Sequence, residues 1–265
     1  MIGVMLFFNF LDVKVHFREL HTKVLLLTFF LSAFAMPVLA YYFLGRRFEE
    51  PYRIGLLLIA CAPTGITTLV LGQYIKGSNY NLVLNNFLFT TFCSMIYIPI
   101  ILKLILSETV KYEILPFAII GQMFALVVFP YFASQMIVHF LKQRWFSWLK
   151  KISKGLTLLL LFGVIMVSVG KIADQFVWTA ESLWLSISIL VIFLIHGGLG
   201  YGLGCFWKSA ELKNTLPFIC SSRNIQLVFA IAVLNFSPLT YVPIIIGIFF
   251  HHLTNAFWLW ILGKN

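Results

Sequence analysis

The feature that most limits how this chain can fold is a succession of long apolar stretches separated by short charged or Pro/Gly-rich breaks. At 1.5 Å rise per residue, a helix of about 20 apolar residues crosses the ~30 Å hydrocarbon core of a bilayer. Barrel strands would alternate apolar and polar residues over ~10 positions, and these stretches do not alternate. We therefore predict an all-α polytopic membrane protein with nine transmembrane helices, approximately over residues 1–13, 24–44, 54–75, 81–106, 114–141, 155–172, 183–206, 215–236 and 239–261.

The composition agrees with a membrane protein, since 61% of the residues are apolar and 11% are charged, against about 25% charged in soluble domains. No segment is polar enough for a soluble domain, so residues 1–265 are predicted to form one transmembrane domain. The net charge of +10 lies mainly in loops, which favours a lipid bilayer over nucleic acid as a partner. The chain has no HExxH motif and no CxxC pair, so neither an enzyme nor a metal cofactor is predicted.

Lysine and arginine are unevenly shared between the two sides on which the loops alternate. One side carries twelve of them: Lys14, Arg18, Lys23, Lys76, Lys142, Arg144, Lys150, Lys151, Lys154, Lys208, Lys213 and Lys264. The other side carries six: Arg46, Arg47, Arg53, Lys103, Lys111 and Lys171. Because cytoplasmic loops are the richer in Lys and Arg, we expect a protein of the cell (inner) membrane with its amino terminus outside and its carboxyl terminus in the cytoplasm.

Two of the apolar stretches contain helix breakers and polar residues at membrane depth. The third contains Ala62-Pro63-Thr64-Gly65, and the eighth contains the polar run from Cys220 to Gln226. Irregular backbone at this depth is tolerated only where it is buried in protein or lines a cavity. The two stretches lie five apart and so run in opposite directions, which is typical of the binding site of an inverted-repeat transporter. An ordinary kinked helix is the alternative for the third stretch.

Arg223 is the one basic residue that lies deep within a stretch, about eight residues or ~12 Å from its start. The nine acidic residues all fall in loops or at the edges of stretches: Asp12, Glu19, Glu49, Glu50, Glu108, Glu113, Asp174, Glu181 and Glu211. A structural Arg would need carbonyl oxygens or a displaced acid to accept its five N–H donors, whereas a functional one binds an anion from solution. We favour the functional interpretation.

Histidines and glycines in the later stretches are interpreted as packing residues. His196, His251 and His252 lie within apolar stretches, where a histidine is usually a hydrogen-bonded contact between helices. The series Gly197, Gly198, Gly200, Gly202 and Gly204 is expected to permit close approach of a neighbouring helix.

Four segments, taken in order, resemble the bile acid:sodium symporter family. They are MIGVMLFFNFLDVKV, FLSAFAMPVLA, CAPTGITTLVLGQYIKGS and SSRNIQLVFAIAV. The resemblance implies an inverted-repeat transporter fold with two broken, crossing helices and with substrate bound between a core and a smaller panel. The panel would comprise the spans near 1–13, 114–141 and 155–172, and the core those near 24–44, 54–75, 81–106, 183–206, 215–236 and 239–261.

The sodium ligands that this resemblance implies are only partly present. Counted along the segments, the ligand positions fall on Ser32, Thr68, Leu69, Leu82, Asn86, Ile219, Ser221, Arg223 and Asn224. Leu69, Leu82 and Ile219 offer no side-chain oxygen. A hard cation needs several oxygen ligands, and a guanidinium in the same place repels it.

We therefore hypothesise a secondary transporter in which Arg223 supplies a fixed positive charge to a small organic anion without sodium. The site residues would be Thr64, Gly65, Thr67, Thr68, Asn86, Ser221, Ser222, Arg223, Asn224 and Gln226. A sodium-coupled symporter is the alternative, with sodium near Thr68, Asn86 and Asn224 and at carbonyls freed by the breaks. A channel or receptor fits less well, because polarity is concentrated on two non-equivalent spans.

Overall fold

The computed structural model describes residues 2–11, 22–106, 116–141, 143–172 and 179–263, and in this part of the chain the elements are helices joined by turns and loops, with one isolated bridge. Its elements are α1 (Ile2–Phe10), α2 (Thr22–Phe30), η1 (Leu31–Ala35), α3 (Met36–Val38), η2 (Leu39–Leu44), η3 (Gly45–Arg47), α4 (Glu50–Cys61), α5 (Thr67–Tyr74), α6 (Tyr80–Leu106), α7 (Pro116–Met123), η4 (Phe124–Val128), α8 (Phe129–Phe140), α9 (Gln143–Ile172), α10 (Ala180–Phe206), α11 (Ala210–Ser221), α12 (Ile225–Asn235), η5 (Pro238–Thr240) and α13 (Tyr241–Leu262).

Five of the described helices are long and apolar enough to cross a membrane: Thr22–Arg47, Tyr80–Leu106, Phe117–Phe140, Ala180–Phe206 and Pro238–Leu262. Large apolar side chains are exposed on these helices, among them Phe43, Leu104 and Phe206, as expected where lipid replaces water. A multi-pass membrane protein follows. The prediction of nine spans is not confirmed. α1 has only nine described residues, too few to cross a bilayer, and two of the predicted spans are each divided into two shorter helices.

The two divided spans are those in which the sequence predicts breaks. α4 ends at Cys61 and α5 begins at Thr67, with Pro63 and Gly65 between them. α11 ends at Ser221 and α12 begins at Ile225. Proline removes a backbone donor and disfavours helical geometry in the residue before it, which explains the first break. Pro217, however, lies inside α11, so it does not cause the second.

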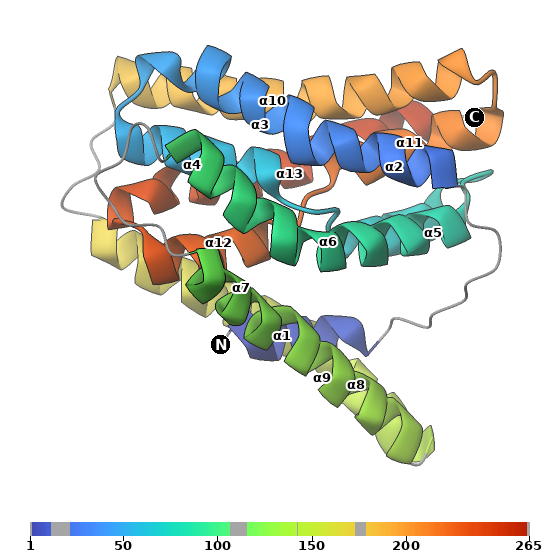
Figure 1. Ribbon diagram of the computed structural model, residues 1–265. Coiled ribbons are helices and arrows are strands. Elements are labelled where there is room, and N and C mark those ends of the chain that lie inside the picture. Colours follow the sequence, from blue (N-terminus) through green and yellow to red (C-terminus); the bar gives the residue numbers. More distant parts are fainter. Residues whose placement is uncertain (1, 12–21, 107–115, 142, 173–178, 264–265) are drawn as a thin grey trace.

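Wide π-helical turns precede prolines in two of the long helices. η1 lies just before Pro37, and η4 just before Pro130. The proline ring clashes with the carbonyl four residues earlier, and a widened turn relieves this clash while the helix continues. α2 to η2 therefore forms one long helical segment, seen in blue in Figure 1.

Glycines on one face of α10 permit close packing against its neighbours, as predicted. A Cβ atom on Gly200 would lie 2.5 Å from the carbonyl oxygen of Leu216 in α11, and one on Gly204 would overlap the backbone of Lys213. Gly197 packs against the indole of Trp258 in α13. Gly198 and Gly202 face open space, so only the glycines at helical spacing along one face serve this purpose.

The helices that include the two breaks lie together in the upper part of Figure 1, and α1, α7, α8 and α9 extend below them. α1 packs against α8 and α9, while α4 packs against α13 and α12. Leu56, Leu57 and Leu58 of α4 are fully buried. The panel and core of the sequence analysis, and the inverted repeat, remain predictions.

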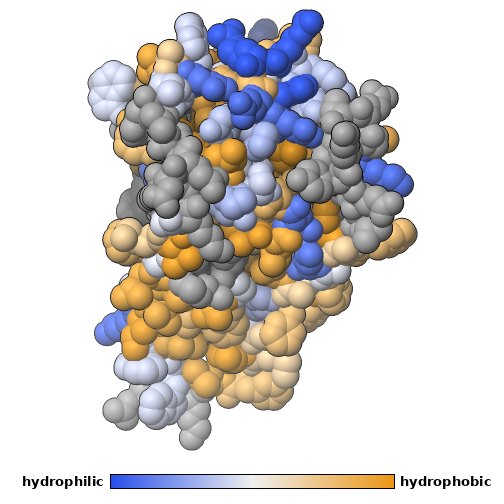
Figure 2. Space-filling view, turned by 90° about the vertical axis from the view of Figure 1, so that its left-hand side faces the viewer, coloured by the Kyte–Doolittle hydropathy of each residue, from blue (hydrophilic) through white to orange (hydrophobic). Residues whose placement is uncertain are grey.

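The loops assigned to one side of the membrane lie near one another. Arg47, at the turn before α4, stacks 5.0 Å from the ring of Trp184 near the start of α10. At the other end, the Asn79 backbone N–H donates to Thr215 Oγ1 at 2.9 Å, and Asn214 donates to the Lys76 carbonyl. Figure 2 views the molecule from the left-hand side of Figure 1 and shows hydrophilic residues gathered at the top above a mostly apolar surface.

One expectation about the loops is wrong. The basic run at 142–154 was expected to be a loop before a span at 155–172, but Gln143–Ile172 is one helix, α9. Lys, Arg, Gln and Leu all have good helix propensity, and no proline or glycine interrupts residues 143–154. The charged residues Asp12, Lys14, Arg18, Glu19, Glu108, Lys111, Glu113, Lys142, Asp174 and Lys264 lie outside the described residues.

Reporter fusions test the predicted orientation. A reporter that is active only outside the cytoplasm should be active when fused after Phe48 and inactive when fused after Ser78 or Glu211, because the second pair of positions lies on the side rich in Lys and Arg. Activity in the reverse pattern would place the carboxyl terminus outside.

Candidate functional site

The two breaks meet in the interior and are held together by backbone hydrogen bonds. The Gly65 N–H donates to the Ser222 carbonyl at 2.8 Å, and the Asn224 N–H donates to the Pro63 carbonyl at 2.8 Å. These bonds form an antiparallel bridge between Thr64 and Arg223. Backbone groups that the helices leave unpaired at the breaks are thus satisfied by each other, which makes irregular backbone stable at membrane depth.

Four helix ends converge where the breaks meet. α4 and α11 end there with their carbonyl groups, and α5 and α12 begin there with their N–H groups. The helix dipole places partial negative charge at carboxyl ends and partial positive charge at amino ends. The crossing therefore has one region that attracts cations and another that attracts anions.

The Arg223 guanidinium lies at the end of α4 and is held by protein acceptors. Its side chain is 3% exposed. Nη1 donates to the Ala62 carbonyl at 3.0 Å and to Ser32 Oγ at 2.9 Å, and Nη2 contacts the His196 ring. Nε, also buried, has no hydrogen-bond partner among the described residues. None of these acceptors, in the part of the chain that the structure describes, is a carboxylate.

This arrangement bears on the two interpretations of Arg223. A structural arginine needs uncharged protein acceptors, and here Nη1 donates to a carbonyl and a hydroxyl while Nη2 contacts a histidine ring. A bidentate carboxylate contact would have to displace some of them. In this conformation Arg223 thus contributes a fixed positive charge, but its guanidinium is not free to bind a carboxylate through two nitrogens. Its role in compensating the negative charge of a substrate stays a proposal.

His251 of α13 joins the two breaks from a third helix. Its Nδ1 accepts from the Arg223 backbone N–H at 3.2 Å, and its Nε2 lies 3.2 Å from Thr67 Oγ1. Thr67 Oγ1 is also 2.7 Å from Ser222 Oγ. Nε2 also lies 3.1 Å from Asn255 Nδ2. His251 therefore fixes the start of α5 and the end of α11 relative to each other.

A second polar network lies on the other side of the first break. Thr64 Oγ1 donates to Asn86 Oδ1 at 2.8 Å, and Asn86 Nδ2 donates to Thr28 Oγ1 at 2.6 Å. The Thr64 N–H donates to Thr90 Oγ1 at 3.2 Å. All four side chains are buried. The network ties the break to α2 and α6 and uses most of its own donors and acceptors.

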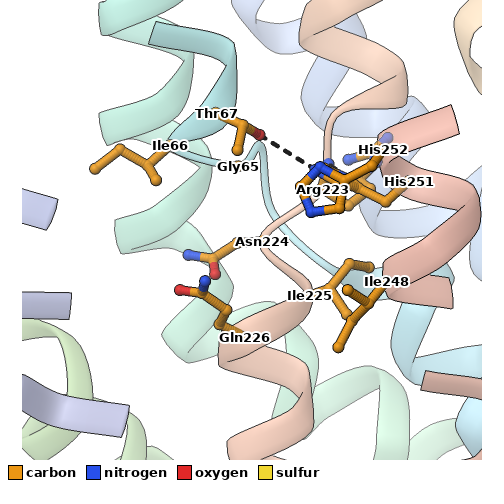
Figure 3. Close-up of a pocket in the computed structure, with 10 residues that line it drawn as sticks. All are labelled: Gly65, Ile66, Thr67, Arg223, Asn224, Ile225, Gln226, Ile248, His251 and His252. Atoms are coloured by element: carbon orange, nitrogen blue, oxygen red, sulfur yellow. Dashed lines mark hydrogen bonds between the residues drawn. The ribbon is translucent and has the colours of Figure 1, made fainter. Parts of the chain in front are cut away.

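A small cavity opens beside the crossing (Figure 3). Its volume is about 40 Å³. It is lined by Gly65, Ile66, Thr67, Arg223, Asn224, Ile225, Gln226, Ile248, His251 and His252. Asn224 and Gln226 extend to one side of the crossing, while Thr67 faces His251. The lining includes the first residues of α5 and α12.

The structure brings together part of the predicted site. Gly65, Thr67, Arg223, Asn224 and Gln226 line the cavity. Ser222 contacts Thr67, and Thr64 and Asn86 belong to the buried network. The hydroxyls of Thr68 and Ser221 are buried, have no hydrogen-bond partner in the residues that the structure describes, and do not line the cavity.

The contribution of α13 to the site and the acceptors of Arg223 were not predicted from the sequence. Ile248, His251 and His252 line the cavity, and Ser32 and His196 hold the guanidinium. His196 and His251 are indeed contacts between helices, as interpreted. The signal that could have found them was the presence of histidines in otherwise apolar spans.

The side chains of the three residues proposed to bind sodium do not share one site, and two of them have oxygens that already accept hydrogen bonds. Asn86 Oδ1 accepts from Thr64, and Asn224 Oδ1 accepts from the Leu227 N–H at 3.2 Å as the amino-terminal cap of α12. Thr68 Oγ1 has no hydrogen-bond partner within the described part of the chain. Sodium needs several oxygens at one point, so these side chains do not fit a sodium site as they stand.

The chain is similar in sequence to one protein family and to two bacterial proteins. Residues 1–179 match the Sodium Bile acid symporter family. "Uncharacterized protein YbaS" of Bacillus subtilis (strain 168) is 25% identical over 249 residues, covering 92% of this chain and 80% of that protein. "Uncharacterized sodium-dependent transporter YocS" of the same organism is 24% identical over 229 residues, covering 83% of this chain and 68% of that protein.

Proposed function

Because the chain belongs to the Sodium Bile acid symporter family, we propose that it is a secondary transporter of a small organic anion, working by alternating access. The anionic group of the substrate binds at the cavity beside the crossing of the two breaks. Thr67, Asn224 and Gln226 supply polar contacts there. The match to transporters rather than enzymes supports this class of function, and the charge of the cavity supports an anion.

The observation that carries the proposal is that two helix amino ends line one cavity. Residues 65–67 lead into α5, and residues 224–226 lead into α12. Each amino end carries roughly half a positive charge. The buried guanidinium of Arg223 adds a full positive charge nearby. Broken helices of transporters place such ends at anionic groups.

The size of the cavity limits what enters it. A volume of about 40 Å³ accommodates a carboxylate or sulfonate group together with few other atoms. The rest of the substrate must then lie outside this cavity, or bind when the protein adopts another conformation.

The relative named as a sodium-dependent transporter favours a second candidate function, a sodium-coupled symporter of the same substrate class.

A thermal-stability screen of the purified protein tests anion binding. Small carboxylates and sulfonates should raise the unfolding temperature, whereas matched neutral amides should not, because a ligand at 100 times its Kd stabilises the folded state by about 2.7 kcal/mol. Each anion that stabilises is then tested for uptake into proteoliposomes. Stabilisation by the neutral amides and by none of the anions would exclude an anion site.

A further inference from the structure

The place at the crossing that attracts a cation is already occupied by part of the protein. Cations are favoured at helix carboxyl ends, where carbonyl oxygens lack helical partners. At the end of α4, the Ala62 carbonyl accepts from Arg223 Nη1 at 3.0 Å, and the Cys61 carbonyl accepts from Tyr97 Oη at 2.7 Å. The cation at this end of α4 is therefore the side chain of Arg223, which lies just before α12.

The oxygens around the guanidinium are also committed. Ser32 Oγ accepts from Arg223 and donates to the Thr28 carbonyl at 2.8 Å. At the end of α11, the Ile219 carbonyl accepts from Thr64 Oγ1 at 3.2 Å, and the Ser222 carbonyl accepts from the Gly65 N–H. A carbonyl can accept twice, but a sodium ion bound to Ala62 would stand within a few ångströms of the guanidinium.

None of the carboxylates that the structure describes compensates for a second positive charge at this point. The described acidic residues are Glu49, Glu50, Glu181 and Glu211, and each lies at the start of a helix, far along the chain from the breaks. Two cations in a buried site repel each other strongly without such compensation. Within the described residues, there is likewise no cluster of acidic, histidine or cysteine side chains that could hold a metal ion.

We infer that Arg223 is a resident cation that takes the place of an exchangeable sodium ion at the crossing, so that substrate binding by this chain does not depend on sodium. The inference rests on the proposed function for its consequence, because the guanidinium then provides the charge that favours an anion at the amino ends of α5 and α12. It separates this chain from a relative described as sodium-dependent.

The first experiment measures thermal unfolding of the purified protein in NaCl, KCl and choline chloride at equal concentration, with no organic anion. The wild-type protein should unfold at the same temperature in all three salts. A rise that saturates with sodium and is absent in potassium would overturn the inference. This comparison needs no variant and no substrate, so its outcome is independent of the proposed function.

Three variants then test whether the guanidinium stands in the place of a cation. Arg223→Gln removes the charge and adds a carbonyl oxygen, and it should gain a stabilisation specific to sodium. Arg223→Lys keeps a charge and should stay insensitive to sodium. Arg223→Met is the matched control, since it removes the charge without adding an oxygen and should gain less than Arg223→Gln. If Arg223→Gln folds and does not respond to sodium, Arg223 does not replace a cation.

The last experiment compares anion binding in the two salts, using an anion that stabilises the wild-type protein. The Kd should agree within about twofold between NaCl and KCl, and a tenfold tighter Kd in NaCl, worth about 1.4 kcal/mol, would overturn the inference. If no anion stabilises the protein in either salt, the proposed function fails, while the comparison of salts without anion still tests the resident cation.

Discussion

Gly65→Ala is expected to separate the two breaks and to abolish transport. A Cβ atom at this position would lie 2.6 Å from the Arg223 carbonyl oxygen and 2.8 Å from its carbonyl carbon. Both atoms belong to the backbone, and the Gly65 N–H itself donates to the Ser222 carbonyl. Neither segment can therefore move away to make room without breaking the bridge. We expect the free energy of unfolding to fall by about 2–3 kcal/mol, measured by thermal or denaturant unfolding in detergent.

Gly121→Ala is the matched control for this change. Gly121 lies in α7, and a Cβ atom there would meet nothing within 4 Å. Alanine has the higher helix propensity, by up to about 1 kcal/mol, so this variant should be as stable as the wild-type protein or slightly more so. Wild-type stability and uptake in Gly65→Ala would show that the breaks are not in the contact described.

Asn224→Asp is expected to abolish anion binding and to leave the fold intact. Asn224 Oδ1 caps α12 by accepting from the Leu227 N–H, and aspartate caps a helix as well as asparagine does. The new charge would line the cavity at the amino end of α12. At a separation of about 4 Å and an effective dielectric of about 20, like charges repel by roughly 4 kcal/mol. Anion affinity should therefore fall about 100-fold or more.

Asn224→Ser separates the loss of a side-chain amide from the gain of a charge. Serine also caps helices and is uncharged, so this variant should lose only the amide contact and weaken anion binding much less than Asn224→Asp does. Unfolding temperature without ligand and anion Kd are measured for both variants. An Asn224→Asp protein that folds and binds the anion as the wild type does would remove the amino end of α12 from the site.

Properties that depend on neighbouring residues were predictable from the sequence. The apolar stretches indicated a helical membrane protein, because backbone groups in lipid must be satisfied within each segment. The breaks at Pro63 and at residues 222–224 were also predictable, since proline and a polar run disrupt a span locally. The extension of α9 through the basic run was not, because helix propensity there competes with the usual association of charge with loops.

The partners of each side chain were decided only by the tertiary structure. Arg223 was recognisable as a buried charge, but its acceptors Ser32, Ala62 and His196 are 191, 161 and 27 residues away. His251 reaches the crossing from α13, which the sequence does not connect with either break. Such contacts depend on how whole helices pack, and a single sequence contains periodicity and propensity but not the distances between distant segments. The chain by itself determined that polar backbone breaks occur in the membrane, and the packing of α4, α11 and α13 determined which groups satisfy them.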